Sequence, residues 1–242
     1  LPYTGGASKY LKNNKIPSHA ILAVEVDSLA SLTLQLIESG IKSILTEKPA
    51  GLFFKEIKDI NNLASKKNCN VFVAYNRRFY SSVNKLIELG ESDGGISSIS
   101  FDFTEWSDSI APLQKGPNTK ERWLLSNSTH VIDLAFFLAG KPDILNSSFS
   151  GSLKWHPSGS CFSGSGITAR GIIFNYRADW DAPGRWGLVA YTKNYKMELA
   201  PLEQLVITER NSVVSKSYNL EDDLDIKFKP GLYNQVASFL SD

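Results

Sequence analysis

A lysine stands where a short apolar run ends, in the segment Glu47-Lys48-Pro49. The run before it, residues 41–46, has the length and composition of a strand. Ligands of open α/β sheets bind beyond the carboxyl ends of parallel strands, so Lys48 is a candidate to face a cofactor crevice. Pro49 fixes the backbone that follows and favours an extended Lys48. A solvated loop lysine followed by a proline that begins a helix would give the same spacing.

Two arginines and an amide follow another strand-like run, in the segment Asn76-Arg77-Arg78-Phe79. Guanidinium groups offer several donors in a fixed geometry and therefore bind phosphate and sugar hydroxyl groups well. Asn76 and Arg77 are thus candidates to line a ligand cleft. Ordinary basic residues on a surface would give the same pattern.

A histidine, His130, lies one residue into a predicted helix over residues 129–139. Histidine titrates close to neutral pH, so an imidazole that faces a cleft could take a proton from a hydroxyl group as that group is oxidised. A single histidine at such a position can also be structural, satisfied by a neighbouring hydroxyl or carbonyl group.

The elements that must position these residues alternate between two periodicities in the first third of the chain. Apolar runs predict strands over 20–26, 41–46 and 70–75, and helical spacing predicts helices over 29–37, 52–67 and 81–90. Asp27 and Ser28 are predicted to cap the first helix and Gly40 to end it. Strand, helix and strand in this order form right-handed βαβ units, so we expect a Rossmann-type, doubly wound parallel sheet.

From residue 96 onward strands dominate, which predicts an α+β domain with a large, mainly antiparallel open sheet packed on a few helices. The chain is therefore expected to divide into domains 1–80 and 81–242. The helices of the second are 129–139 and 233–240. The predicted strands are 97–106, 143–154, 167–180, 186–192, 196–199, 204–208 and 213–218. Gly164-Ser165-Gly166 precedes a strand and not a helix, so we interpret it as a hairpin or flexible loop instead of a nucleotide-binding loop.

Composition narrows the class of protein. The chain has 242 residues, 42% of them hydrophobic, which is enough for one large core or two modest ones. Binding of nucleic acid needs a basic face, and the formal charge of +1 gives no hint of one. No apolar stretch is long enough to span a membrane. Cys69 and Cys161 lack metal-ligand spacing, so no metal site and no disulfide are expected. By default we expect a reduced, cytoplasmic protein.

Tryptophan is concentrated before and after the His130 helix. Trp123 precedes that helix, and residues 178–186 mix aromatic, acidic and basic side chains. Such surfaces suit sugars, whose apolar faces stack on aromatic rings while their hydroxyl groups bind charged partners. A turn that seals the sheet, or a subunit contact, would need the same residues.

In their order along the chain, Glu47-Lys48-Pro49, Asn76-Arg77-Arg78-Phe79 and His130-Val131-Ile132-Asp133 resemble the motifs of the Gfo/Idh/MocA family. This family includes glucose-fructose oxidoreductase and inositol dehydrogenases, and its members pair a Rossmann domain with an open-sheet α/β domain. The resemblance covers residues 20–140 well and the strand-rich remainder loosely.

The resemblance implies an NAD- or NADP-dependent oxidoreductase that acts on a sugar, polyol or nucleotide-sugar. The broad open sheet of the second domain is a surface that subunit pairing commonly covers, so we expect a homo-oligomer, a dimer or tetramer. It implies catalytic roles for Lys48 and His130 and a supporting role for Asp133. The implied cofactor contacts are Glu47, Lys48, Pro49, Asn76 and Arg77. The implied substrate contacts are Lys48, Arg77, Trp123, Asn127 and His130.

Three positions depart from the family pattern. Ser126 stands where family members place an aspartate four residues before the histidine, and residues 25–29 replace the usual Thr-Pro-Pro-x-x-His. No Gly-x-Gly-x-x-Gly follows an early strand, so we expect the nucleotide domain to be incomplete at its N-terminus. Two further hypotheses therefore stay open: a regulatory homologue that binds NAD(P) or sugar without catalysis, and a reductase of cyclic imines or biliverdin-like substrates.

Overall fold

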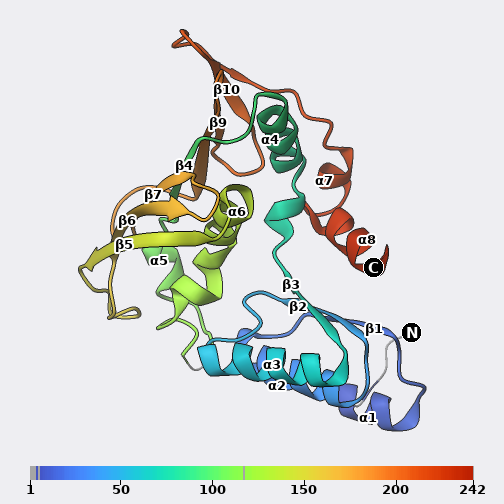
Figure 1. Ribbon diagram of the computed structural model, residues 1–242. Helices are drawn as coiled ribbons and strands as arrows, with labels where there is room; N and C mark the ends of the chain where they lie inside the picture. The colour runs from blue at the N-terminus through green and yellow to red at the C-terminus, as the bar shows by residue number, and fades with distance from the viewer. Residues whose placement is uncertain (1–3, 5, 117, 242) are drawn as a thin grey trace. The chain divides into compact units, whose positions relative to one another are not determined.

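The computed structural model describes residue 4, residues 6–116 and residues 118–241. They divide into two compact units, each visible in Figure 1. Unit 1 contains the residues up to Ala74 together with Gly116, Asn118 and Thr119, and unit 2 contains the other described residues. No helix in the described part of the chain is long and apolar enough to cross a membrane.

Unit 1 is built around a parallel sheet in which β2 lies between β1 and β3. Its elements are α1 (Gly6–Asn13), β1 (His19–Leu22), α2 (Val26–Glu38), β2 (Ser43–Glu47), α3 (Phe54–Lys67) and β3 (Asn70–Ala74). Helices α2 and α3 run side by side (Figure 1). The core between the helices and the sheet includes the fully buried Leu29, Ile37 and Ile44. Because the strands are parallel, Leu22, Glu47 and Ala74 end at the same edge of this sheet.

The start of α2 differs from the prediction. The helix begins at Val26, one residue after Glu25, so Asp27 and Ser28 lie in its first turn and are not its caps. The Asp27 carboxylate instead accepts a hydrogen bond from Thr119 Oγ1 at 3.1 Å, a partner 92 residues away. The other end follows the prediction, because Gly40 has a φ of 96° immediately after the helix.

Unit 2 contains an eight-stranded sheet in the order β11-β10-β9-β8-β4-β7-β6-β5 among the described residues. All neighbouring strands are antiparallel except β4 and β7. The strands are β4 (Ser98–Asp102), β5 (Pro142–Ser150), β6 (Cys161–Thr168), β7 (Ile173–Asp179), β8 (Gly187–Tyr191), β9 (Tyr195–Leu199), β10 (Val206–Glu209) and β11 (Ser215–Ser217). The helices are η1 (Asn76–Phe79), α4 (Ser81–Ser92), α5 (Ser107–Ile110), η2 (Leu124–Ser128), α6 (Thr129–Ala139), α7 (Asp223–Lys227) and α8 (Leu232–Ser241).

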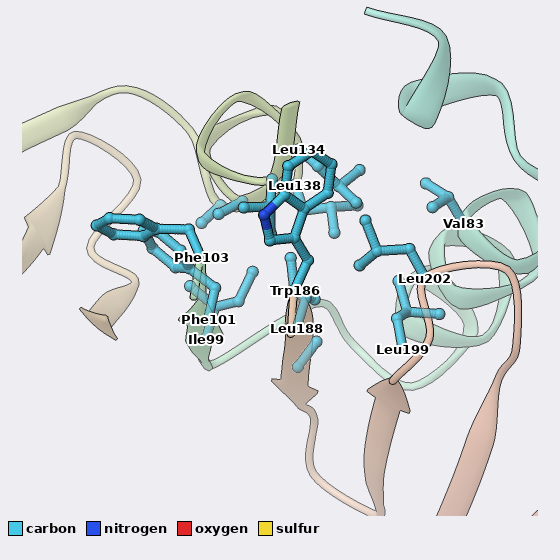
Figure 2. Close-up of a cluster of buried hydrophobic side chains, with 14 of the residues drawn as sticks. Val83, Ile99, Phe101, Phe103, Leu134, Leu138, Trp186, Leu188, Leu199 and Leu202 are labelled. Carbon is cyan, nitrogen blue, oxygen red and sulfur yellow. The ribbon is translucent and has the colours of Figure 1, made fainter. Parts of the chain in front are cut away.

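The core of unit 2 lies between this sheet and helices α4 and α6. Figure 2 shows Phe101 and Leu188 from the sheet, and Phe103 just after β4, facing Leu134 and Leu138 of α6. The indole ring of Trp186 extends from the start of β8 towards the same helix (Figure 2). Trp186 is 6% exposed, so this ring is part of the packed interior. The α/β class, with a parallel sheet followed by a large, mainly antiparallel one, is confirmed.

Two predictions about strands are wrong. Residues 167–180 do not form one strand, because Thr168 ends β6 and a tight turn with Gly171 at a φ of 76° leads into β7. Gly164-Ser165-Gly166 is neither a hairpin nor a flexible loop, because it lies inside β6. A Cβ atom on Gly166 would lie 1.8 Å from the Ile144 carbonyl oxygen, so this glycine allows the strands to approach closely.

Candidate functional site

The tip of β2 carries the first predicted site segment, Glu47-Lys48-Pro49, and it lies in unit 1. Lys48 follows the last strand residue directly and is half-buried. Its backbone N–H donates to Glu47 Oε2 at 3.2 Å, and the Ala50 N–H donates to the Glu47 carbonyl at 3.0 Å. The Lys48–Pro49 peptide bond is cis, and Ala50 has a φ of 70°. These backbone bonds are local, so a few consecutive residues set the path of the chain at this tip.

Arg77 and His130 meet in unit 2, although 53 residues separate them in the sequence. Arg77 Nη1 lies 3.0 Å from His130 Nε2 and also donates to Asn76 Oδ1 at 2.7 Å. A guanidinium group can only donate, so Nε2 is the acceptor and the imidazole in this arrangement is neutral. His130 is 6% exposed and its ring also contacts Tyr75 and Trp186, with centroids 6.1 Å and 5.8 Å away.

The second arginine of the motif has a different partner. Arg78 Nε donates to Asp133 Oδ2 at 2.7 Å, and the Arg78 guanidinium also lies 4.8 Å from the Phe137 ring centroid. Burial raises the pKa of Asp133, and hydrogen bonding to Arg78 partly offsets that rise. This pair ties η1 to α6. Asp133 therefore makes a contact between two elements, and the supporting role that the resemblance implies for it stays a prediction.

A buried carboxylate that the sequence interpretation did not single out lies beside these residues. Glu105 follows β4 and is 1% exposed. It accepts hydrogen bonds from Ser128 Oγ at 2.7 Å, Asn127 Nδ2 at 3.0 Å and Trp186 Nε1 at 3.3 Å. Arg185 Nη1 lies 3.3 Å from its second oxygen. Burial raises the pKa of Glu105, while the bond from Ser128 and the charge of Arg185 act in the opposite direction.

Trp186 connects this carboxylate with the histidine. Its ring contacts His130, and the guanidinium carbons of Arg77 and Arg185 lie 5.5 Å and 4.6 Å from its centroid. Arg185 also lies 4.7 Å from the ring of Trp106, which is 56% exposed. Cationic groups are attracted to the faces of indole rings, so the two tryptophans hold Arg185 at the edge of this cluster.

The C-terminal segment fixes the turn that carries Arg77. Asn76 Nδ2 donates to the Pro230 carbonyl at 2.9 Å, and Asp225 accepts from the backbone N–H groups of Ser81 and Gly231, each at 2.8 Å. Gly231 has a φ of 72°, and a Cβ there would lie 2.2 Å from the Asn76 carbonyl oxygen. A glycine is therefore needed for this close approach.

The predicted site residues thus fall into two groups. Asn76, Arg77, Asn127 and His130 lie in one cluster of unit 2, where Asn127 reaches it through Glu105. Trp123 is 7% exposed, belongs to the unit 2 core and contacts the Trp155 ring edge-on at 5.9 Å. Glu47, Lys48 and Pro49 lie together in unit 1. The catalytic, cofactor and substrate roles of all these residues stay predictions.

Comparison with solved structures shows the fold. An oxidoreductase from Agrobacterium radiobacter in complex with NAD+, L-tartaric acid and magnesium has a TM-score of 0.73 at 14% identity, over 98% of this chain and 70% of that one. Levoglucosan dehydrogenase in complex with NADH and L-sorbose has a TM-score of 0.72 at 18% identity. The match covers 94% of this chain and 70% of that one. UDP-N-acetylglucosamine 3-dehydrogenase GnnA from Acidithiobacillus ferrooxidans has a TM-score of 0.69 at 13% identity. The match covers 93% of this chain and 69% of that one.

These chains are similar to this one in fold, and their sequence identities are too low to show a shared activity. No protein-family model matches the sequence, and no curated protein matches it. The structural neighbours are dehydrogenases and oxidoreductases, and two of them were solved with a nicotinamide cofactor bound. The fold is therefore that of NAD-dependent sugar dehydrogenases and related oxidoreductases.

Proposed function

We propose that the protein is an NAD- or NADP-dependent oxidoreductase that transfers a hydride between the nicotinamide ring and a carbon of a sugar, polyol or nucleotide-sugar. The observation that carries the proposal is the contact between the half-buried Arg77 and the buried His130, which puts a neutral imidazole acceptor beside a fixed cation. The fold shared with dehydrogenases supports the same reading. Fold alone does not define activity, so the proposal depends on the site.

The edge of the unit 1 sheet fits a nicotinamide cofactor. Three parallel strands end there together, and a ligand of an open α/β sheet binds beyond such ends. After β2 the backbone turns at Ala50, which is 2% exposed, so the turn itself packs inward while Lys48 is only half-buried. Glu47, Lys48 and Pro49, with Asn76 and Arg77, are the residues proposed to hold the cofactor. When bound, the cofactor would accept or return the hydride.

His130 is the proposed proton acceptor. A substrate hydroxyl that donates to Nε2 would replace the present bond from Arg77, because that lone pair accepts one donor in this arrangement. The Arg77 guanidinium is then proposed to donate to the substrate oxygen, which becomes more negative as its proton leaves. Lys48 is proposed to orient the same hydroxyl group, and Asn127 and Trp123 to contact the substrate.

The test is NAD(P)H formation by the intact protein across a panel of sugars, polyols and nucleotide-sugars. His130→Gln is expected to lower kcat by about 10²–10⁴, the usual contribution of general acid–base catalysis. The matched control is His19→Gln, which changes a half-buried histidine of β1 that bonds Ser18. Turnover of His130→Gln at the wild-type rate would contradict the proposal. Cofactor binding without turnover of any substrate would favour the non-catalytic homologue, to which the hydroxyl group at Ser126 also points.

A further inference from the structure

A single buried carboxylate connects the elements that surround His130. Glu105 lies in the loop after β4, yet it bonds Asn127 and Ser128 from the turn that leads into α6. It also accepts from the indole N–H of Trp186, whose ring contacts the imidazole of His130. One side chain thus holds both the start of the histidine's helix and a ring against which the histidine packs.

The hydrogen-bond partners of Glu105 favour its ionised form and oppose the effect of burial, which raises its pKa. Its neighbours present a hydroxyl group, an amide nitrogen, an indole N–H and a guanidinium, and each of these donates to the carboxylate. A protonated carboxyl group would need an acceptor in return. At 1% exposure the carboxylate is removed from solvent, so its charge is weakly screened and acts on nearby groups.

The positive charges near His130 are opposed by the negative charge of Glu105. Arg77 bonds the imidazole directly, and Arg185 lies 4.6 Å from the ring centroid of Trp186, the indole that contacts His130. Both cations oppose protonation of the histidine, as a like charge always does. Tyr75 also contacts the imidazole ring, and because burial raises the pKa of its phenol it stays neutral near pH 7. Glu105 supplies the opposing negative charge.

We propose that Glu105 is a positioning residue of the His130 site, which fixes the imidazole through Ser128 and Trp186 and favours its protonated form electrostatically. The inference rests on the proposed function, in which His130 takes up a proton during oxidation. Glu105 does not contact the reacting atoms in this account. It acts through the histidine and through the ring beside it.

The test follows the protonation of His130 by NMR in the intact protein, with the resonance assigned from His130→Gln. Glu105→Gln keeps the shape of the side chain and removes its charge, so the pKa of His130 is expected to fall by on the order of half a pH unit. Glu105→Asp keeps the charge and is expected to restore most of the wild-type titration. Asp102→Asn is the matched control, because Asp102 ends β4 and bonds Thr104 N and Arg177 instead of this cluster.

An unchanged His130 titration in Glu105→Gln would overturn the proposal. If Glu105→Gln does not fold, NMR of the wild-type protein gives a second test, in which the signal of the Glu105 carboxyl carbon is followed as the pH changes. Its chemical shift is expected to show an inflection at the pH where His130 titrates, and this inflection should disappear in His130→Gln. A wild-type carboxyl signal without that inflection would also overturn the proposal.

Turnover separates this inference from the proposed function. If the enzyme is active, the acidic limb of its kcat/KM profile is expected to move to lower pH in Glu105→Gln, in the same direction as the NMR titration. A purely structural role would lower the rate and leave the limb in place. If no substrate is turned over while the titration responds to Glu105→Gln, the proposed function fails and the coupling of Glu105 to His130 stands.

Discussion

The tip of β2 and the His130 cluster hold their polar residues in different ways. At the tip, the Glu47 side chain and carbonyl accept from the N–H groups of the next few residues, so the path of the chain is fixed locally. In the cluster, Arg77 meets a histidine 53 residues away and Glu105 meets Trp186, 81 residues away. A local turn can therefore be predicted from a motif, whereas a buried polar cluster exists only after the tertiary fold has formed.

The largest expected effect on stability comes from breaking the contact that holds the Arg77 turn. Gly231→Ala would force a residue with a side chain into a φ of 72° and place its Cβ against the Asn76 carbonyl. We expect a loss of about 2 kcal/mol or more in the free energy of unfolding, measured by urea denaturation.

The matched glycine near the β2 tip is Gly51. A Cβ there would lie 2.9 Å from Glu56 Oε2, which accepts hydrogen bonds from the Leu52 and Phe53 N–H groups at 2.7 Å and 3.0 Å, and the φ of Gly51 is not positive. Gly51→Ala should therefore cost less than Gly231→Ala, because a side chain must shift but the backbone is not strained. Equal losses at the two glycines would contradict the contrast between the long-range cluster and the local turn.

A smaller effect is expected from the ion pair between η1 and α6. The Asp133 side chain is 14% exposed, and Asp133→Ala would leave Arg78 without this partner. Because the Arg78 side chain is 39% exposed and water can replace part of the interaction, we expect a loss of about 1 kcal/mol by chemical denaturation.

The control for that pair is in unit 1. Asp59 pairs with Lys55 on the surface of α3, where the side chains are 43% and 84% exposed. Asp59→Ala is expected to leave the unfolding midpoint unchanged. A larger shift for Asp59→Ala than for Asp133→Ala would reverse the predicted order.

The smallest predicted effect is a dependence of stability on pH. Burial raises the pKa of Glu105 above its ordinary value of 4.5, so the folded protein binds that proton more tightly than the unfolded chain does. The contribution of this proton to stability is fully present below pH 4.5 and is lost as the pH rises through the raised value. The stability of the wild-type protein relative to Glu105→Gln should therefore fall over that window, as measured by urea denaturation at several pH values. A relative stability that rises with pH would contradict the sign.

Much of the fold follows from periodicity. The helix over residues 129–139 has the predicted bounds, and β3 differs from its prediction by one residue at its end. The predicted cap at Asp27 is wrong because its carboxylate bonds Thr119, a tertiary partner that no local pattern reveals. The predicted strand over 167–180 is wrong because Gly171 allows a tight turn that the apolar pattern hides.

Part of the site also has a signal in the amino-acid sequence. Ile99, Phe101 and Phe103 alternate at buried positions, and Glu105 continues the same period. A carboxylate at an apolar phase of a strand-like run is a signal of a buried, paired charge. Its partners could not be predicted, because Ser128 and Trp186 come from two other parts of the chain. For the same reason the sequence names Lys48 and His130 only as separate candidates.

The most direct test of the proposed activity is a double-mutant cycle on turnover, with Lys48→Met, His130→Gln and the variant that carries both changes. Two residues that serve one proton and hydride transfer step act as a unit, so their losses do not add. We predict that each single variant loses most of the NAD(P)H formation and that the double variant is about as slow as the slower single one. Losses that multiply in the double variant, or turnover of either single variant at the wild-type rate, would contradict the catalytic roles proposed for Lys48 and His130.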